Sequence, residues 1–325
     1  MMNEPISRIR RAMLGAVPAA LFGAPAFAQA FPSKPITLVC PFTAGGTADV
    51  QLRVLAAAAG KELGVPVVVE TRAGAAGTLG PASIVSAAPD GYTLSMATGI
   101  ALLRQPFIVP TRYDPAKDFT YILGVTRFEL GLAVRADAPW RNLAEFVADA
   151  KKNPGKFAYG TAGAATGQHT AMLRLCDAAG IACTHIPYKG SGDVFNALAG
   201  GHVQAISETS GWAPFVDSGK FRLLAVYSES RLKRWPSAPT AKEQGYDVTD
   251  SVPWGIVGPA GMSAALTKTL HDAFHKSLSD AAFVKTLALV GQEPWDADST
   301  AYRNYMVSRI PVERDLVAKY RLKER

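Results

Sequence analysis

The sequence predicts an α/β fold made of two doubly wound units, each a mainly parallel sheet with helices on both faces. Three observations support this prediction. Strand-like and helix-like segments alternate from residue 36 onward, which is the order expected of parallel strands joined by helices. The strand-like segments are continuous apolar runs, as in sheets covered on both faces. A glycine-rich turn also joins a strand to a helix once in each unit.

The first unit extends to about residue 98. Its expected elements are a strand at 36–41, a helix at 47–63 that ends at Gly64, a strand at 65–70, a helix at 79–88 and a strand at 92–98. Glycine directly after the last apolar position is a typical helix end.

The second unit follows two β-type stretches at 121–125 and 130–135. Its expected elements are helix 143–152, strand 156–159, helix 168–179, strand 183–187, helix 193–199, strands 203–207 and 221–227, and an extended segment at 248–257. Apolar residues at helical spacing predict one helix over 266–278 and a second around 302–306, which Pro311 should interrupt.

Residues 1–28 have the pattern of a cleaved secretory signal peptide. Three arginines precede an apolar stretch at 12–22, and Ala26-Phe27-Ala28 is a small-residue cleavage site. The apolar stretch is shorter than the ~20 residues that span a bilayer. We therefore expect export to the periplasm with cleavage after Ala28.

Composition excludes one class of partner. The 325-residue chain has a net charge of +7, which becomes +5 without the leader's three arginines and one glutamate. The basic residues are spread out, and no basic stripe with interleaved aromatics is present, so we expect no nucleic-acid partner. Mild basicity is compatible with an acidic ligand.

The two glycine-rich turns are the main candidate site. The first contains Phe42, Thr43, Ala44, Gly45, Gly46 and Thr47, and the second contains Thr161, Ala162, Gly163 and Thr166. Glycine lets backbone N–H groups approach a ligand, and a threonine stands where the N-cap of the following helix is expected. A helix N-terminus attracts anions. Two such turns in separate units predict a clamp around a small anion, although each could also be a tight turn without a ligand.

Four further residues are expected at the same rim, because the carboxyl ends of parallel strands meet at one edge of a sheet. They are Thr98, His169, Glu208 and Thr209. His169 could contact the solute or be structural. A carboxylate at position 208 would repel a second acid group of the solute and favour a cationic or hydroxyl group.

The cysteines and histidines indicate no metal site. No Cys/His cluster has zinc spacing, and His271 and His275 have no third ligand beside them. Cys176 and Cys183 flank the end of a predicted helix. An oxidising compartment would permit a disulfide between them, and the sequence leaves both the bridged and the reduced state open.

The chain also lacks common catalytic signatures. It has no G-x-S-x-G elbow, no P-loop and no G-x-G-x-x-G after its first strand. We therefore expect neither enzymatic activity nor a cofactor.

A series of motifs then identifies a family. They are FPSKPI at 31–36, PFTAGGTAD at 41–49, VVVETRAGAAGTLG at 67–80, APDGYTL at 88–94, YDPAKDF at 113–119, NPGKFAYGTAG at 153–163, HIPYKGSGD at 185–193 and LAGGHVQ at 198–204. With these motifs in this order, the chain resembles the Bug-type, TctC-like extracytoplasmic solute-binding proteins of tripartite tricarboxylate transporters. The resemblance runs from about residue 31 to the C-terminus.

The resemblance implies a type II periplasmic-binding-protein fold, in which two α/β domains close on a solute. Domain 1 would contain residues 31–129 and 254–325, and domain 2 residues 130–253. It further implies that backbone N–H groups of the two turns hold a ligand carboxylate. Ala44 and Ala165 stand where the family usually has proline and glycine, and Glu208 stands where aspartate is common, so the solute is left open.

The function implied is capture of a small carboxylate by a monomeric receptor and its delivery to membrane permease subunits. A sensor that presents the solute to a membrane signalling protein such as a kinase is an alternative, and an α/β enzyme acting on a small acid is a third reading.

Overall fold

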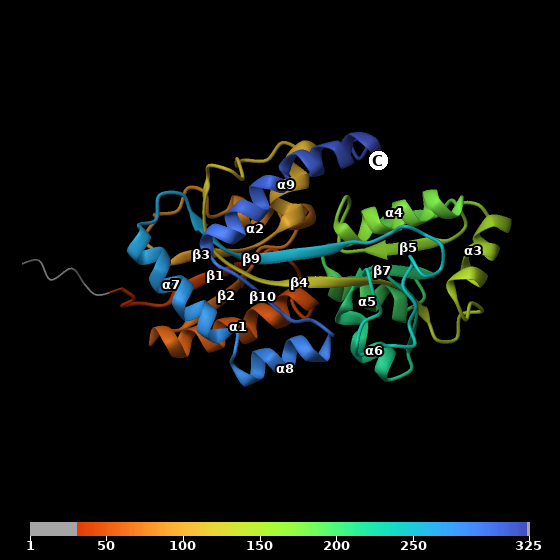
Figure 1. Cartoon of the computed structure of the whole chain (residues 1–325), viewed down its shortest axis with the longest axis horizontal. Helices are drawn as coiled ribbons and strands as arrows, with labels where there is room; N and C mark the ends of the chain where they lie inside the picture. The colour runs from red at the N-terminus through yellow and green to blue at the C-terminus, as the bar shows by residue number, and fades with distance from the viewer. Residues whose placement is uncertain (1–30, 324–325) are drawn as a thin grey trace, which may run out of the picture. The chain divides into compact units, whose positions relative to one another are not determined.

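A computed structural model describes residues 31–323 of the chain, and the residues from Pro32 onward form one compact unit. The expected signal peptide and its cleavage site lie outside the described residues. The unit is an α/β structure, as predicted, with helices on both faces of a mixed sheet (Figure 1).

The described strands form one sheet in the order β2-β1-β3-β9-β4-β7-β5-β6, with β8 and β10 also paired to β4. We call its two parts the first and second half-sheets. The first contains β1 (Ile36–Cys40), β2 (Val67–Thr71), β3 (Thr93–Thr98), β9 (Ser251–Pro259), β10 (Pro294–Ala297) and residues 119–129 of β4 (Phe119–Arg135). The second contains residues 130–135 of β4 with β5 (Ala158–Thr161), β6 (Thr184–Pro187), β7 (Ala205–Thr209) and β8 (Phe221–Val226).

Strands β4 and β9 connect the two half-sheets. They pair antiparallel from Phe119 opposite Pro259 to Glu129 opposite Ser251, and from Leu130 onward β4 pairs with β7. Figure 1 shows both strands passing side by side along the middle of the unit. The sequence predicted two separate β stretches here, and the structure has one strand of 17 residues.

The polar residues Thr126 and Arg127 explain the difference, because they break the apolar pattern without ending the strand. The Thr126 hydroxyl donates to the carbonyl of Glu293. The Arg127 guanidinium lies 4.6 Å from the ring centre of Trp295. Both side chains therefore have partners on β10 or just before it, and the backbone remains extended.

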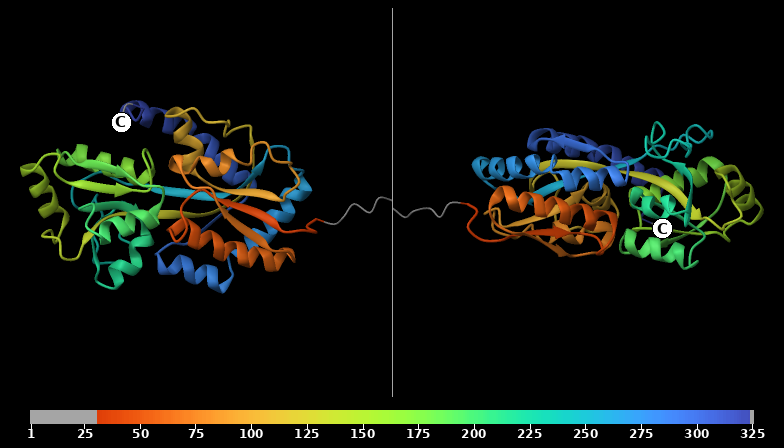
Figure 2. Two further views of the ribbon diagram at one scale, coloured as in Figure 1. Left: turned by 180° about the vertical axis from the view of Figure 1, so that it is seen from behind. Right: turned by 90° about the horizontal axis from the view of Figure 1, so that it is seen from below.

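Helices cover both faces of the first half-sheet (Figure 2). Helix α1 (Thr47–Leu63) packs with α7 (Ala264–Ser277) and α8 (Ala281–Leu289) on one face. The short helix α2 (Leu79–Ala82), the π-helical turn η2 (Ile100–Arg104) and α9 (Ser299–Lys319) lie on the other.

Two predictions about these helices are wrong in detail. The expected helix 79–88 is α-helical only over α2, and then tightens into turns with Ser83 N donating to Gly80 O and Ile84 N to Pro81 O. Pro311 does not interrupt α9. Proline removes one hydrogen bond, and the buried residues Met306 and Val317 hold the helix on either side of it.

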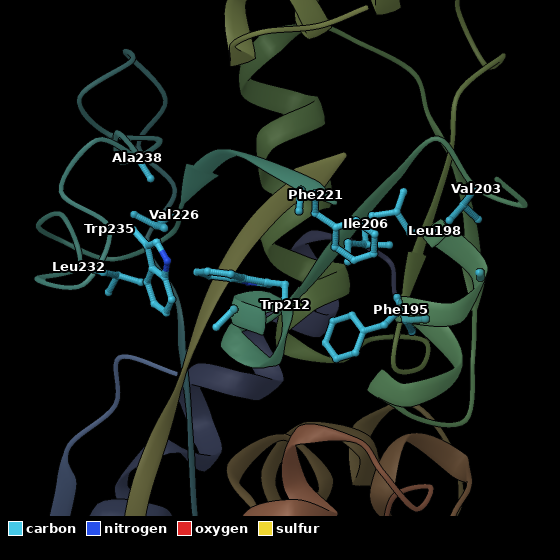
Figure 3. Packing of buried hydrophobic residues seen from close by; sticks show 14 residues of the cluster. Phe195, Leu198, Val203, Ile206, Trp212, Phe221, Val226, Leu232, Trp235 and Ala238 are labelled. Atoms are coloured by element: carbon cyan, nitrogen blue, oxygen red, sulfur yellow. The ribbon is translucent and has the colours of Figure 1, made fainter. Parts of the chain in front are cut away.

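The second half-sheet carries α4 (Gly167–Ala179) on one face and α5 (Ser191–Ala199) and α6 (Ala213–Asp217) on the other, with α3 (Leu143–Lys152) at the far edge. Its core is centred on Trp212, whose ring lies 4.7 Å from that of Trp235. Figure 3 shows Phe195 and Phe221 beside this pair. This packed core supports the strand ends that carry the site.

Candidate functional site

A small cavity lies where the half-sheets meet. Its lining comes from the first half (Phe42, Thr47, Ala48, Ala76, Thr98, Ile100), from β4 and β9 (Phe128, Val252) and from the second half (Ala162, Thr166, Gln168, Ser191, Thr209). The cavity measures about 20 Å³, which is room for roughly one ordered water molecule. An organic solute could enter only if the halves first move apart.

Three helices begin at this cavity. Helix α1 starts at Thr47, α4 at Gly167 and α5 at Ser191. The first N–H groups of a helix have no intrahelical acceptor, and the helix dipole adds partial positive charge there. None of the thirteen described lining residues has a charged side chain. The positive potential of the cavity therefore comes from backbone groups.

The first glycine-rich turn is held by its own helix. The Gly45 N–H donates to Asp49 Oδ2 at 3.0 Å, and Arg53 Nε donates to Asp49 Oδ1 at 2.9 Å. Gly45 has φ of +77°, which glycine adopts without strain. Its N–H is thus occupied inside the protein, and Gly45 lines a different groove, beside α5. The N-terminal residues Thr47 and Ala48 face the cavity.

The second glycine-rich turn is held by its own helix and by a side chain of β7. The Ala162 N–H donates to Glu208 Oε1 at 3.0 Å. Thr166 caps α4 by accepting from the backbone N–H of His169, as predicted, whereas Gly46 and not Thr47 is the N-cap of α1. Ala165 has φ of +54°, and its N–H donates to His169 Nδ1 at 2.8 Å.

Glu208 is fully buried at the end of β7. Its Oε1 accepts from Ala162 N and from Gln168 Nε2, at 3.0 and 3.3 Å. Its Oε2 accepts from Ser191 Oγ at 2.7 Å and from the N–H and hydroxyl of Thr209 at 2.7 and 3.0 Å. Burial raises the pKa of Glu208, and the hydrogen bonds from Ser191, Thr209 and Ala162 oppose that rise. The sequence placed this carboxylate at an open rim, whereas the structure places it behind the cavity wall.

His169 is also buried, at 4% exposure. Its ring stacks on His185 with centroids 3.7 Å apart, and His185 Nε2 lies 2.7 Å from Thr161 Oγ1. Burial lowers the pKa of His185 to about 4. The two rings support the second turn from behind, so the contacts of His169 match the structural alternative for this residue.

The predicted site residues therefore separate into two groups. Those that line the cavity are Phe42, Thr47, Thr98, Ala162, Thr166 and Thr209. Those that do not are Thr43, Ala44, Gly45, Gly46, Thr161, Gly163, His169 and Glu208. The lining residues that sequence reasoning missed are Ala48, Ala76, Ile100, Phe128, Gln168, Ser191 and Val252. Ser191 could have been found by the same rule as the turns, because it begins a helix after a strand.

The two halves approach each other through glycine. The Thr47 hydroxyl lies 2.8 Å from the Thr209 hydroxyl. A Cβ at Gly211 would overlap the Thr47 hydroxyl, and a Cβ at Gly46 would lie 3.2 Å from the backbone nitrogen of Gly192. Side chains at these glycines would keep the halves apart.

Arg104 fastens the second turn to the first half. Its Nε donates to Glu313 Oε2 of α9 at 2.6 Å, and its Nη1 donates to Ala165 O and Thr170 Oγ1. Gln105 adds a bond to Ala164 O at 3.0 Å. The Arg104 side chain is only 2% exposed, so this ion pair is buried where α9 meets α4.

The remaining candidates lie apart from the cavity. No disulfide joins Cys176 to Cys183, and a hydrogen bond with the Cys176 thiol lowers the pKa of Cys183. The rings of His271 and His275 stack at 5.5 Å on α7. Within residues 31–323, no cluster of three or more His, Cys, Asp or Glu side chains could hold a metal ion. No helix in the same range is both long and apolar enough to span a bilayer.

This architecture, an α/β sheet in two halves with a cavity at converging helix N-termini, is that of periplasmic binding proteins. The structure of the periplasmic binding protein BugD matches with a TM-score of 0.86 at 29% identity, over 90% of this chain and 99% of that one. MatC from Rhodopseudomonas palustris with bound malate matches at 0.83 and 26% identity, over 88% and 100% of the chains. An R. palustris protein with adipate matches at 0.84 and 25%, over 89% and 98%.

Comparison of sequences identifies the family within this class of proteins. The family model described as "Tripartite tricarboxylate transporter family receptor" matches residues 51–322. A Cupriavidus necator protein described as "UPF0065 protein in gbd 5'region" is 41% identical over 96% of both chains. Protein BugT of Bordetella pertussis is 32% identical over 88% of this chain and 89% of that one. The chain belongs to this receptor family, which the resemblance predicted.

Proposed function

We propose that this protein is a periplasmic receptor that closes on a small carboxylate and delivers it to the membrane subunits of a tripartite tricarboxylate transporter. The observation that carries the proposal is the cavity itself, which has three helix N-termini and no charged lining side chain. Such a site attracts an anion through backbone N–H groups. Relatives solved with malate and adipate support a carboxylate as the anion.

The solute carboxylate would accept hydrogen bonds from the first-turn N–H groups of α1, at Thr47 and Ala48. Phe42, Thr98, Ala162, Thr166 and Thr209 would contact the rest of the solute. The other predicted residues of the two turns would shape the backbone rather than touch the solute.

Closure would bring together domain 1 (31–129 and 254–325) and domain 2 (130–253). The change of partners of β4 at residues 129 and 130 supports this boundary. The tiny cavity implies that the described form is closed. N-terminal sequencing of the exported protein tests the proposed localisation. The expected result is a chain that begins at Gln29, after cleavage behind Ala28.

A thermal-shift screen of residues 29–325 tests the binding function. Mono-, di- and tricarboxylates and aromatic acids would each be compared with the matching amide and alcohol. An acid present at 100 times its Kd should add about 2.7 kcal/mol to the free energy of unfolding. The proposal is wrong if no acid raises the Tm, or if amides and alcohols raise it equally.

A further inference from the structure

The Glu208 carboxylate lies directly behind the cavity wall. The four residues that donate to it, Ala162, Gln168, Ser191 and Thr209, all line the cavity. Five donors converge on its two oxygens, and two of them are backbone N–H groups whose direction is fixed. This is the arrangement of an ionised carboxylate, which only accepts hydrogen bonds.

Glu208 therefore takes up five donors of the second half that lie at the cavity wall, three from side chains and two from the backbone. Each donor that bonds to Glu208 is unavailable to a second anionic group in the cavity. The negative charge of Glu208 also faces any such group without an intervening cation, because the lining residues are all uncharged. Like charges in a poorly hydrated site repel strongly.

The first half differs, because its internal carboxylate lies to one side. Asp49 bonds to the Gly45 N–H and is paired with Arg53. Gly45 lines the neighbouring groove instead of the cavity. The N–H groups of Thr47 and Ala48 consequently remain for one carboxylate.

The rest of the lining is complementary to a solute whose remaining part is apolar. Phe42, Ile100, Phe128 and Val252 contribute large apolar side chains from four separate elements. A second carboxylate buried against these side chains would lose its hydration without a partner in return.

We propose that the solute is a small monocarboxylate, with Glu208 as a built-in anion that occupies the place of a second carboxylate. This inference rests on the proposed function, since it specifies the solute of the same cavity. It predicts a solute with one carboxylate fewer than malate and adipate, the dicarboxylates present in two related structures.

The test uses pairs of acids that differ only in a terminal methyl or carboxylate: butyrate and succinate, hexanoate and adipate, 3-hydroxybutyrate and malate. Thermal shift and calorimetry on residues 29–325 give the affinity ratio of each pair. We expect the best monocarboxylate to bind at least tenfold more tightly than its dicarboxylate partner.

Variants then assign the preference to Glu208. Glu208→Gln removes the charge and keeps the shape, and Glu208→Asp shortens the side chain by one methylene, so that it no longer reaches the Ala162 N–H. Either variant should lower the preference for the monocarboxylate at least tenfold. Glu129→Gln is the matched control, because Glu129 is a half-buried carboxyl that lines a different groove.

The outcomes distinguish the two proposals. Equal or tighter binding of the dicarboxylates by the unaltered protein overturns the monocarboxylate inference and leaves carboxylate capture intact. Absence of any acid binding overturns the proposed function and this inference with it. A preference that survives in both Glu208 variants, or is lost equally in Glu129→Gln, removes Glu208 from the explanation. If one Glu208 variant fails to fold, the other decides.

Discussion

The two glycine-rich turns follow the same local plan and have different surroundings. Each connects a strand to a helix, and each gives one backbone N–H to a carboxylate of the protein itself. In the first turn that carboxylate is Asp49, from the same helix and paired with Arg53. In the second it is Glu208, which comes from a neighbouring strand and is held only by neutral donors.

A helix N-terminus is therefore available to a ligand only where the protein has not already filled it. The first turn keeps the start of α1 open to the cavity, whereas in the second turn the Ala162 N–H is used by Glu208 and the Ala165 N–H by His169. The second turn also depends on the other half of the molecule, through Arg104 and Gln105. The variants below test this comparison.

The largest effect is expected from Arg104→Met. It removes the bonds to Ala165 O and Thr170 and leaves Glu313 buried without its partner. Loss of one member of a buried ion pair costs about 3–5 kcal/mol. Urea denaturation measures the change. The double variant Arg104→Met with Glu313→Leu should recover much of the loss, and a loss below about 1 kcal/mol in the single variant would contradict the role given to this pair.

Thr47→Pro should affect binding more than stability. Thr47 is the first residue of α1, where proline is tolerated, and Gly46 before it has the extended conformation that precedes proline. The variant loses one N–H donor toward the cavity, and a hydrogen bond to a charged group contributes about 1.5–3 kcal/mol, or roughly 10- to 150-fold in Kd. Calorimetry with the best acid from the screen measures it.

Thr47→Val is the control for that variant. It keeps the N–H and loses only the hydroxyl bond to Thr209. If Thr47→Val weakens acid binding as much as Thr47→Pro, the hydroxyl and not the backbone donor is responsible.

The smallest effect concerns acid. The pKa of His185 is lowered from 6.5 to about 4, so below pH 6.5 the unfolded chain binds a proton that the folded chain does not. The contribution of neutral His185 to the free energy of unfolding should be fully present above pH 6.5. It should fall by about 1–3 kcal/mol as the pH falls toward 4. Urea unfolding between pH 4 and 7 should show a flatter profile for His185→Gln.

Asp250 provides a comparison of opposite sign. Burial raises its pKa from 3.8 to about 6, so its contribution to stability is lost as the pH rises from 3.8 to 6. Asp250→Asn should therefore remove this loss of stability, so that the variant has a higher free energy of unfolding than the wild type at neutral pH. For His185, the contradicting result is a fall in stability below pH 6.5 that is the same in the wild type and in His185→Gln.

The sequence predicted the parts of the site that local chemistry determines. Thr166 caps α4 because a threonine side chain can accept from the N–H three residues on, and Gly45 takes a positive φ that its turn requires. Local chemistry could not predict that Phe128 and Val252 line the cavity. Their place in the cavity depends on the pairing of two strands that are more than 100 residues apart in sequence.

Glu208 shows a second limit. Its position after a strand predicted the correct edge of the sheet, but its orientation depends on Ser191 and Gln168, which come from two other helices. The path of α9 through Pro311 likewise depends on tertiary packing. Local propensity therefore located these residues without determining what they contact.

The course of the chain through the sheet has a practical consequence. Both β1 and α9 belong to the first half, and residues 136–250 form an insertion whose strands all lie in the second half-sheet. A surface tether or a fused reporter joined ahead of β1 would thus hold only the first half, whereas the C-terminal end of α9 also packs against Leu173 of α4 in the second half. The inserted half would stay free to move, so immobilisation at the β1 end should leave the proposed closure around a solute intact.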